Sequence, residues 1–173
     1  YPSIMKGLYA YVSGGYSDAS IYPKYRFGFS LYKSLPSAFE LEVGMRYLDF
    51  GTSQTDLYTL SLTKYWGSYM FTARTYMVPS KSGSSHSVSV LVRRYFGSAS
   101  TYIGITGGIG SAATDIEFAE DLRRLNSRSI SVDAQYPVTE RIRVGGNAGF
   151  DYEELNRYNR ERFSFKLFLS YRF

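Results

Sequence analysis

The chain has 173 residues, 18% of them aromatic, and carries a formal net charge of +5 at pH 7. This length suits a single domain, which we place at residues 1–173. A transmembrane helix needs about 20 consecutive apolar residues, and the sequence contains no such run. Because cysteine is absent, disulfides, thiolate metal sites and cysteine nucleophiles are excluded. The basic residues are spread at strand spacing, without a Lys/Arg block or a glycine-rich phosphate loop, so nucleic acid is not an expected partner.

Tyr1 and Pro2 lack the regions of a signal peptide, so we expect a mature exported protein or a domain of one.

Apolar and polar residues alternate along most of the chain. Alternation predicts strands because successive side chains of a strand point to opposite faces. In 38–49, for example, Phe39, Leu41 and Val43 alternate with Glu40 and Glu42. Only the first of ten such segments leaves its apolar face undecided; the segments are 6–16, 22–33, 38–49, 56–66, 69–79, 86–96, 101–110, 127–136, 141–152 and 162–173.

The connections between these segments alternate in length. Short turns are expected at 34–37, 67–68, 97–100 and 137–140, and longer loops at 17–21, 50–55, 80–85, 111–126 and 153–159. Short turns at one end and long loops at the other are typical of outer-membrane barrels, with both termini at the short-turn, periplasmic end. In the loop 111–126, near-helical spacing of apolar residues predicts a short helix with Thr114 as its N-cap.

The charged residues decide which face of the strands points inward. A soluble barrel or sandwich would pack the apolar face inside and could show this pattern over two or three strands. Here nine of ten segments show it, each over about eleven residues, which is the length that crosses a bilayer at a tilt. A closed barrel also satisfies every backbone group in lipid. We therefore predict an all-β fold, a transmembrane antiparallel up-and-down β-barrel of about ten strands. The charged residues then line the lumen: Lys24, Arg26, Glu40, Glu42, Arg46, Arg74, Arg93, Asp133, Arg143, Asp151 and Lys166.

The chain ends on a strand with one apolar face. This stretch resembles the C-terminal signal of Gram-negative outer-membrane proteins, which their barrel-assembly machinery reads, as opposed to an ordinary edge strand. The residues that would carry the signal are Phe165, Leu167, Leu169, Tyr171 and Phe173.

Two interpretations of the lumen stand side by side. A ten-stranded barrel is only slightly wider than the eight-stranded kind that side chains fill. The charges would then form a buried network that plugs the barrel, the interpretation we favour. Alternatively, the excess of basic residues would line a narrow, anion-favouring passage.

Enzyme constellations are not apparent. Omptin proteases use acidic residues and a histidine at the extracellular rim, whereas the single histidine here, His86, shares a face with Val88 and Val90 and points to lipid. A lipid-A deacylase has Ser and His facing the membrane, as Ser84 and His86 do, but Val88 stands where its His-x-Ser order needs serine. We expect no enzyme, no metal and no cofactor.

The stretch Lys64–Gly97, "KYWGSYMFTARTYMVPSKSGSSHSVSVLVRRYFG", resembles the YaiO-type outer-membrane barrel family, as do "GITGGIG" and the last strand. The resemblance implies a Gram-negative outer-membrane protein without catalytic residues, in a family sometimes linked to surface-polysaccharide synthesis. Exopolysaccharide secretion or a cell-envelope role is therefore the expected function, and an adhesin or receptor barrel that binds through its loops is the alternative. Expected partners are outer-membrane lipid and lipopolysaccharide, the barrel-assembly machinery, and a periplasmic scaffold or polysaccharide.

Overall fold

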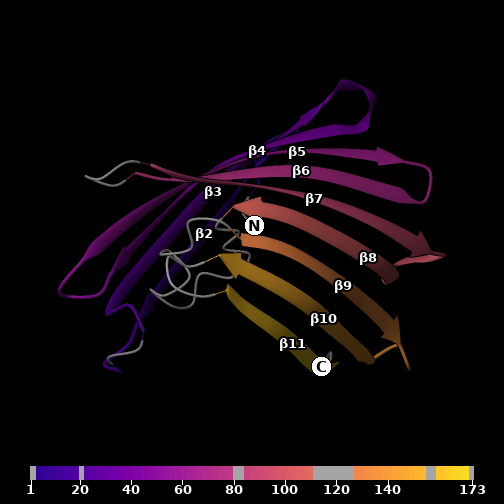
Figure 1. The fold of residues 1–173 in the computed structure, drawn as a ribbon. Helices are drawn as coiled ribbons and strands as arrows, with labels where there is room; N and C mark the ends of the chain where they lie inside the picture. Colours follow the sequence, from indigo (N-terminus) through magenta and orange to yellow (C-terminus); the bar gives the residue numbers. More distant parts are fainter. Residues whose placement is uncertain (1–2, 20–21, 80–83, 111–126, 155–158, 172–173) are drawn as a thin grey trace.

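The computed structural model describes residues 3–19, 22–79, 84–110, 127–154 and 159–171. These residues form one antiparallel sheet in which each strand pairs with its neighbours in sequence, from β1 to β11 (Figure 1). Among them, no helix has the length and apolar character needed to cross a membrane. The strands are β1 Ser3–Met5, β2 Leu8–Tyr16, β3 Tyr25–Leu35, β4 Phe39–Asp49, β5 Gln54–Trp66, β6 Tyr69–Val78, β7 Ser85–Phe96, β8 Ser98–Gly110, β9 Ser127–Pro137, β10 Ile142–Glu154 and β11 Asn159–Tyr171.

The all-β, up-and-down architecture predicted from the sequence is confirmed, and its ten segments correspond to β2–β11. The strand count is eleven because the short β1 folds back on β2 through Lys6 and Gly7. Gly7 has a φ of 72°, which glycine adopts without steric cost. The sheet is strongly curled, and β2–β4 run across the direction of β8–β11 in Figure 1. The predicted closure is not seen in the described residues, where β1 and β11 are the two edges.

The connections lie alternately at the two ends of the sheet. At one end, which we call the turn end, lie the connections 6–7, 36–38, 67–68, 97 and 138–141. At the other, the loop end, lie 17–24, 50–53, 79–84, 111–126 and 155–158. The connections predicted at 50–55 and 153–159 are shorter than expected because β5, β10 and β11 extend into them. The helix expected after Thr114 lies outside the described residues.

The two faces of the sheet are opposite in polarity, and the polar face is the buried one. Glu42 is 4% exposed while Val43 beside it is 52% exposed, and Ser89 is 7% exposed against 50% for Val90. A soluble protein buries the apolar member of such a pair. The exposed apolar face, which we call the outer face, continues over the sheet through Leu60, Leu62, Val88, Val92, Ile103, Ile105, Ile130 and Val132.

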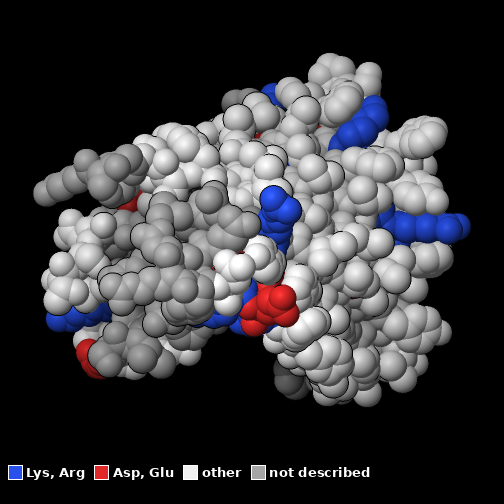
Figure 2. Space-filling model, in the orientation of Figure 1, with Lys and Arg blue, Asp and Glu red and all other residues white. Residues whose placement is uncertain are grey.

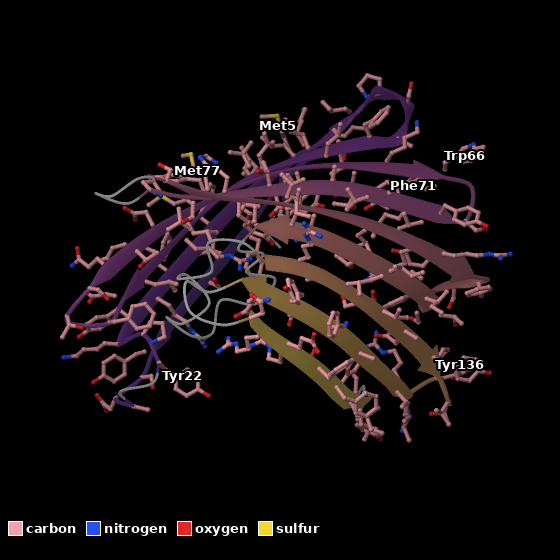
Figure 3. All side chains as sticks on the ribbon, in the orientation of Figure 1. Met5, Tyr22, Trp66, Phe71, Met77 and Tyr136 are labelled. Carbon is pink, nitrogen blue, oxygen red and sulfur yellow. The ribbon has the colours of Figure 1, made fainter. Side chains whose placement is uncertain are left out.

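Aromatic residues mark both ends of the outer face. In Figure 3, Trp66 and Tyr136 lie at the turn end, and Tyr22 lies at the opposite end. Trp66 is 71% exposed although it is a large apolar side chain. Such aromatics at the two ends of an apolar band are typical of the interfacial girdles of membrane barrels.

The structure also shows which face of the first predicted segment, 6–16, points outward, since its Val12 and Tyr16 are exposed on the outer face.

A depth-dependent cost of arginine tests the outer face. Val90 lies in the middle of β7 and Phe96 at its turn end, both outward and exposed. We expect Val90→Arg to destabilise the folded protein in liposomes by about 2–4 kcal/mol and Phe96→Arg by about 0–1 kcal/mol, because only the first places a charge at the bilayer midplane. Reversible unfolding in urea measures both free energies. Equal costs at the two depths would contradict a lipid-facing surface.

Candidate functional site: a polar interior centred on Glu42

Glu42 is buried on the polar inner face of β4 and accepts four hydrogen bonds. Its Oε1 accepts from Ser30 Oγ at 3.1 Å and Tyr32 OH at 3.0 Å. Its Oε2 accepts from Ser61 Oγ at 2.8 Å and Arg74 Nη2 at 2.8 Å. The donors come from β3, β5 and β6, and they surround a carboxylate that solvent barely reaches. We call these five residues the Glu42 cluster.

The register of the strands brings the Glu42 cluster together. Tyr32, Glu42, Ser61 and Arg74 are successive Cα partners across β3, β4, β5 and β6. Ser61 is too small to separate its neighbours, so Arg74 reaches across β5 to Glu42. A buried carboxylate is stable only when cations and hydrogen-bond donors replace its water. The four donors meet that requirement.

A second ion pair crosses one strand over a glycine. Arg93 Nη2 on β7 lies 2.7 Å from Asp133 Oδ2 on β9, and Gly104 of β8 is the Cα partner of both residues. A Cβ at Gly104 would lie 2.4 Å from Asp133 Oδ1, which real Cβ contacts do not permit. The guanidinium of Arg93 also lies 4.0 Å from the centre of the Tyr102 ring, a cation–π contact. Glycine at this position therefore permits the pair.

A third group of ion pairs joins β10 to β11 near the loop end. Arg162 Nη2 lies 3.0 Å from Asp151 Oδ2, and Arg160 Nη2 lies 3.0 Å from Glu153 Oε2. Glu153 is buried. Asp151 was predicted as an interior charge, whereas Glu153 fell in the predicted loop 153–159, and Arg160 and Arg162 fell before or at the start of the predicted last segment. The charge alternation in "NRERF" was the signal that could have extended the strand.

Inward-facing tyrosines gather near the turn end. Tyr9 and Tyr32 stack with ring centres 4.8 Å apart and planes within 7° of parallel. Tyr9 OH donates to Glu40 Oε2 at 2.9 Å. On the other side, Tyr95 and Tyr102 meet edge to face at 5.9 Å. These tyrosines were not predicted as a group, and the inward direction of Tyr9 was not predicted because the apolar face of the segment 6–16 was undecided.

The remaining predicted charges are more scattered. Arg26, Arg46 and Arg143 lie on the inner face of β3, β4 and β10, and no described carboxylate lies within ion-pair distance of them. Lys24 lies in the connection before β3, with its Nζ 5.9 Å from the Tyr25 ring centre, so it is not a strand residue as predicted. Lys166 is the Cα partner of Asn147 on β10.

The residues of the expected assembly signal lie on the outer face of β11. Phe165, Leu167 and Leu169 are each more than two-thirds exposed, and Tyr171 is about half exposed. Phe173 lies outside the described residues. Their exposure means that the last strand presents one continuous apolar face to the surroundings.

The residues considered for catalysis lie away from the polar interior. His86 is exposed on the outer face at the loop end of β7, and Ser84 is exposed just before that strand. The described part of the chain holds no group of three or more His, Cys, Asp or Glu side chains that could bind a metal ion.

Comparison with known proteins identifies the family. The family model of the YaiO membrane beta barrel domain matches residues 1–115, which contain β1–β8. Neither a search of curated proteins nor a search of solved structures gave a match. The family model covers more than half of the chain, and the exposed apolar face and buried polar face agree with a barrel in a membrane. The chain therefore belongs to the YaiO membrane beta barrel domain family, a family of outer-membrane β-barrels.

Proposed function

We propose that the protein is a non-enzymatic outer-membrane β-barrel whose interior is filled by its own side chains and which serves exopolysaccharide secretion or the cell envelope. The observation that carries the filled interior is the Glu42 cluster, in which both carboxylate oxygens are fully bonded by protein groups. A water-filled channel would leave such a carboxylate hydrated. Other small polar side chains of the inner face are buried as well: Thr59, Thr63, Thr72, Ser87 and Ser89.

The barrel closes, in this proposal, between β11 and the part of the β2 edge that the short β1 leaves uncovered, because β2 runs antiparallel to β11. Unpaired backbone groups in a bilayer cost several kcal/mol each, so an open edge is unstable there. The outer face of β11 is the most exposed apolar surface of the described strands, with Phe163 at 80%. The β1–β2 turn and the C-terminal end of β11 then lie together at the turn end. We place that end in the periplasm because short turns face it in such barrels.

The inward tyrosines near the turn end support a role with polysaccharide. Sugars present apolar C–H faces and hydroxyl groups, which suit aromatic rings beside a carboxylate. Tyr9, Tyr32 and Glu40 provide this combination at the periplasmic mouth of the proposed barrel. The alternative function, an adhesin or receptor, depends mainly on loop 111–126, which lies outside the described residues.

Removal of one cation distinguishes a filled interior from a pore. We expect wild-type protein in planar bilayers to show no steady conductance. Arg74→Ser should lower the free energy of unfolding by about 3 kcal/mol, because it leaves Glu42 buried without its cation. Arg46→Ser is the matched control, since Arg46 faces inward without a described carboxylate partner. Steady, ion-selective channels in the wild type, with equal free energies of unfolding for the two variants, would instead establish a narrow ion-conducting passage.

Polysaccharide secretion can be measured in the producing bacterium. We expect deletion of the chain to lower the amount of polysaccharide outside the cell, and the wild-type chain to restore it. Tyr9→Ala/Tyr32→Ala should restore it poorly, whereas Tyr58→Ala, which removes an outward tyrosine, should restore it fully. Unchanged secretion in the deletion strain would reject the polysaccharide role.

A further inference from the structure

Basic side chains are concentrated at the turn end of the outer surface. Lys33, Lys64 and Arg94 end their strands on the outer face, on β3, β5 and β7. Lys6 and Arg141 lie in the adjoining turns, and Glu140 is the one described acid in these turns. Glu40 lies nearby in sequence but faces inward, where it accepts the hydrogen bond from Tyr9. We call Lys33, Lys64 and Arg94 the basic belt.

Two of these cations are held against aromatic rings. Lys64 Nζ lies 4.3 Å from the Phe39 ring centre and donates a hydrogen bond to the Ser37 carbonyl oxygen. The Arg94 guanidinium lies 5.6 Å from the Tyr69 ring centre and 5.0 Å from that of Phe96. These contacts fix the charged groups at the level of the aromatic girdle.

The register places Trp66, the only tryptophan of the chain, beside the basic belt. Trp66, Tyr69 and Arg94 are successive Cα partners across β5, β6 and β7. Figure 3 shows Trp66 and Phe71 together at this end, and in Figure 2 basic side chains project there. The cations of the basic belt thus lie beside the aromatic side chains of the girdle.

The opposite end of the outer surface has the reverse charge. At the loop end, the described outward or loop acids are Asp18, Asp49, Asp56 and Glu161, against Lys24 and Arg128. Four acids against two bases contrast with five bases against one acid at the turn end. Among the described residues of the outer surface and its connections, the excess positive charge therefore lies at the turn end.

We propose that the basic belt binds the phosphate groups of anionic glycerophospholipids in the leaflet around the turn end. Leu62 and Val92 are the next outward residues on β5 and β7 after Lys64 and Arg94, and they contact the acyl chains. The girdle rings then lie at the glycerol level, and the cations reach the phosphates. The inference rests on the proposed orientation, with the turn end in the periplasmic leaflet. The acidic loop end is the less suitable surface for anionic headgroups.

Quenching of Trp66 fluorescence tests this binding directly. The protein is folded into phosphatidylcholine liposomes that contain phosphatidylglycerol, with bromine on the chains of one lipid or the other. Quenching by both brominated lipids reports membrane contact, and their ratio reports headgroup preference. We expect wild type to prefer the anionic lipid about threefold or more over its mole fraction. Lys64→Gln/Arg94→Gln should reduce the preference to near one, and the matched control Lys24→Gln/Arg128→Gln should keep it.

The outcomes separate the possible failures. Quenching in proportion to mole fraction in wild type, or equal loss of preference in both double variants, would overturn the proposal. So would relief of quenching by free inorganic phosphate, or displacement of the brominated anionic lipid by an equal amount of lipid A. If neither brominated lipid quenched Trp66, the membrane-facing assignment of the outer surface would instead be rejected. Heat-dependent migration in electrophoresis verifies that each variant has folded.

Discussion

The interior of this sheet is polar, and polar groups lose free energy when they are buried unless each one finds a partner. Glu42 illustrates how the structure meets that requirement, since hydroxyls and a guanidinium from three other strands replace its water. The cluster needs β3–β6 in one register, because a shift of one residue would turn every side chain to the opposite face. The same shift would direct charges into lipid. Hydrogen bonding of the interior polar groups and contact of the outer apolar side chains with lipid therefore favour the same register.

Sequence alternation predicted the strands and their faces because successive side chains of a strand point to opposite faces. In a membrane barrel the face toward lipid is apolar and the face toward the interior is polar. Residues such as Val90 and Ser89 differ sharply in polarity, and the structure exposes the first and buries the second. The first segment failed to predict its faces because "LYAYV" is apolar at both parities. The strand β1 was missed because three residues give no detectable period. The shorter connections at 50–53 and 155–158 show that polar strand ends resemble loops in sequence.

The charged residues of the interior were identifiable, but their pairing was not. Glu42 and Arg74 are separated by a strand, and only the register Glu42–Ser61–Arg74 shows that they meet. Arg93 and Asp133 likewise meet because a glycine, Gly104, leaves room between them. Single-residue patterns carry no information on such cross-strand neighbours. The basic belt also emerges only when several turns are brought to one end of the sheet.

The central claim is that one face of every strand contacts lipid while the other packs against a filled interior. Collision accessibility of spin labels tests it most directly, with one label at a time at positions 86–94 of β7 in liposomes. Oxygen concentrates in the bilayer, so labels at 88, 90 and 92 should be its most frequent collision partners. Labels at 87, 89 and 91 should collide rarely with both oxygen and a water-soluble nickel complex. Accessibility without a period of two, or frequent nickel collisions at 89 and 91, would contradict the account.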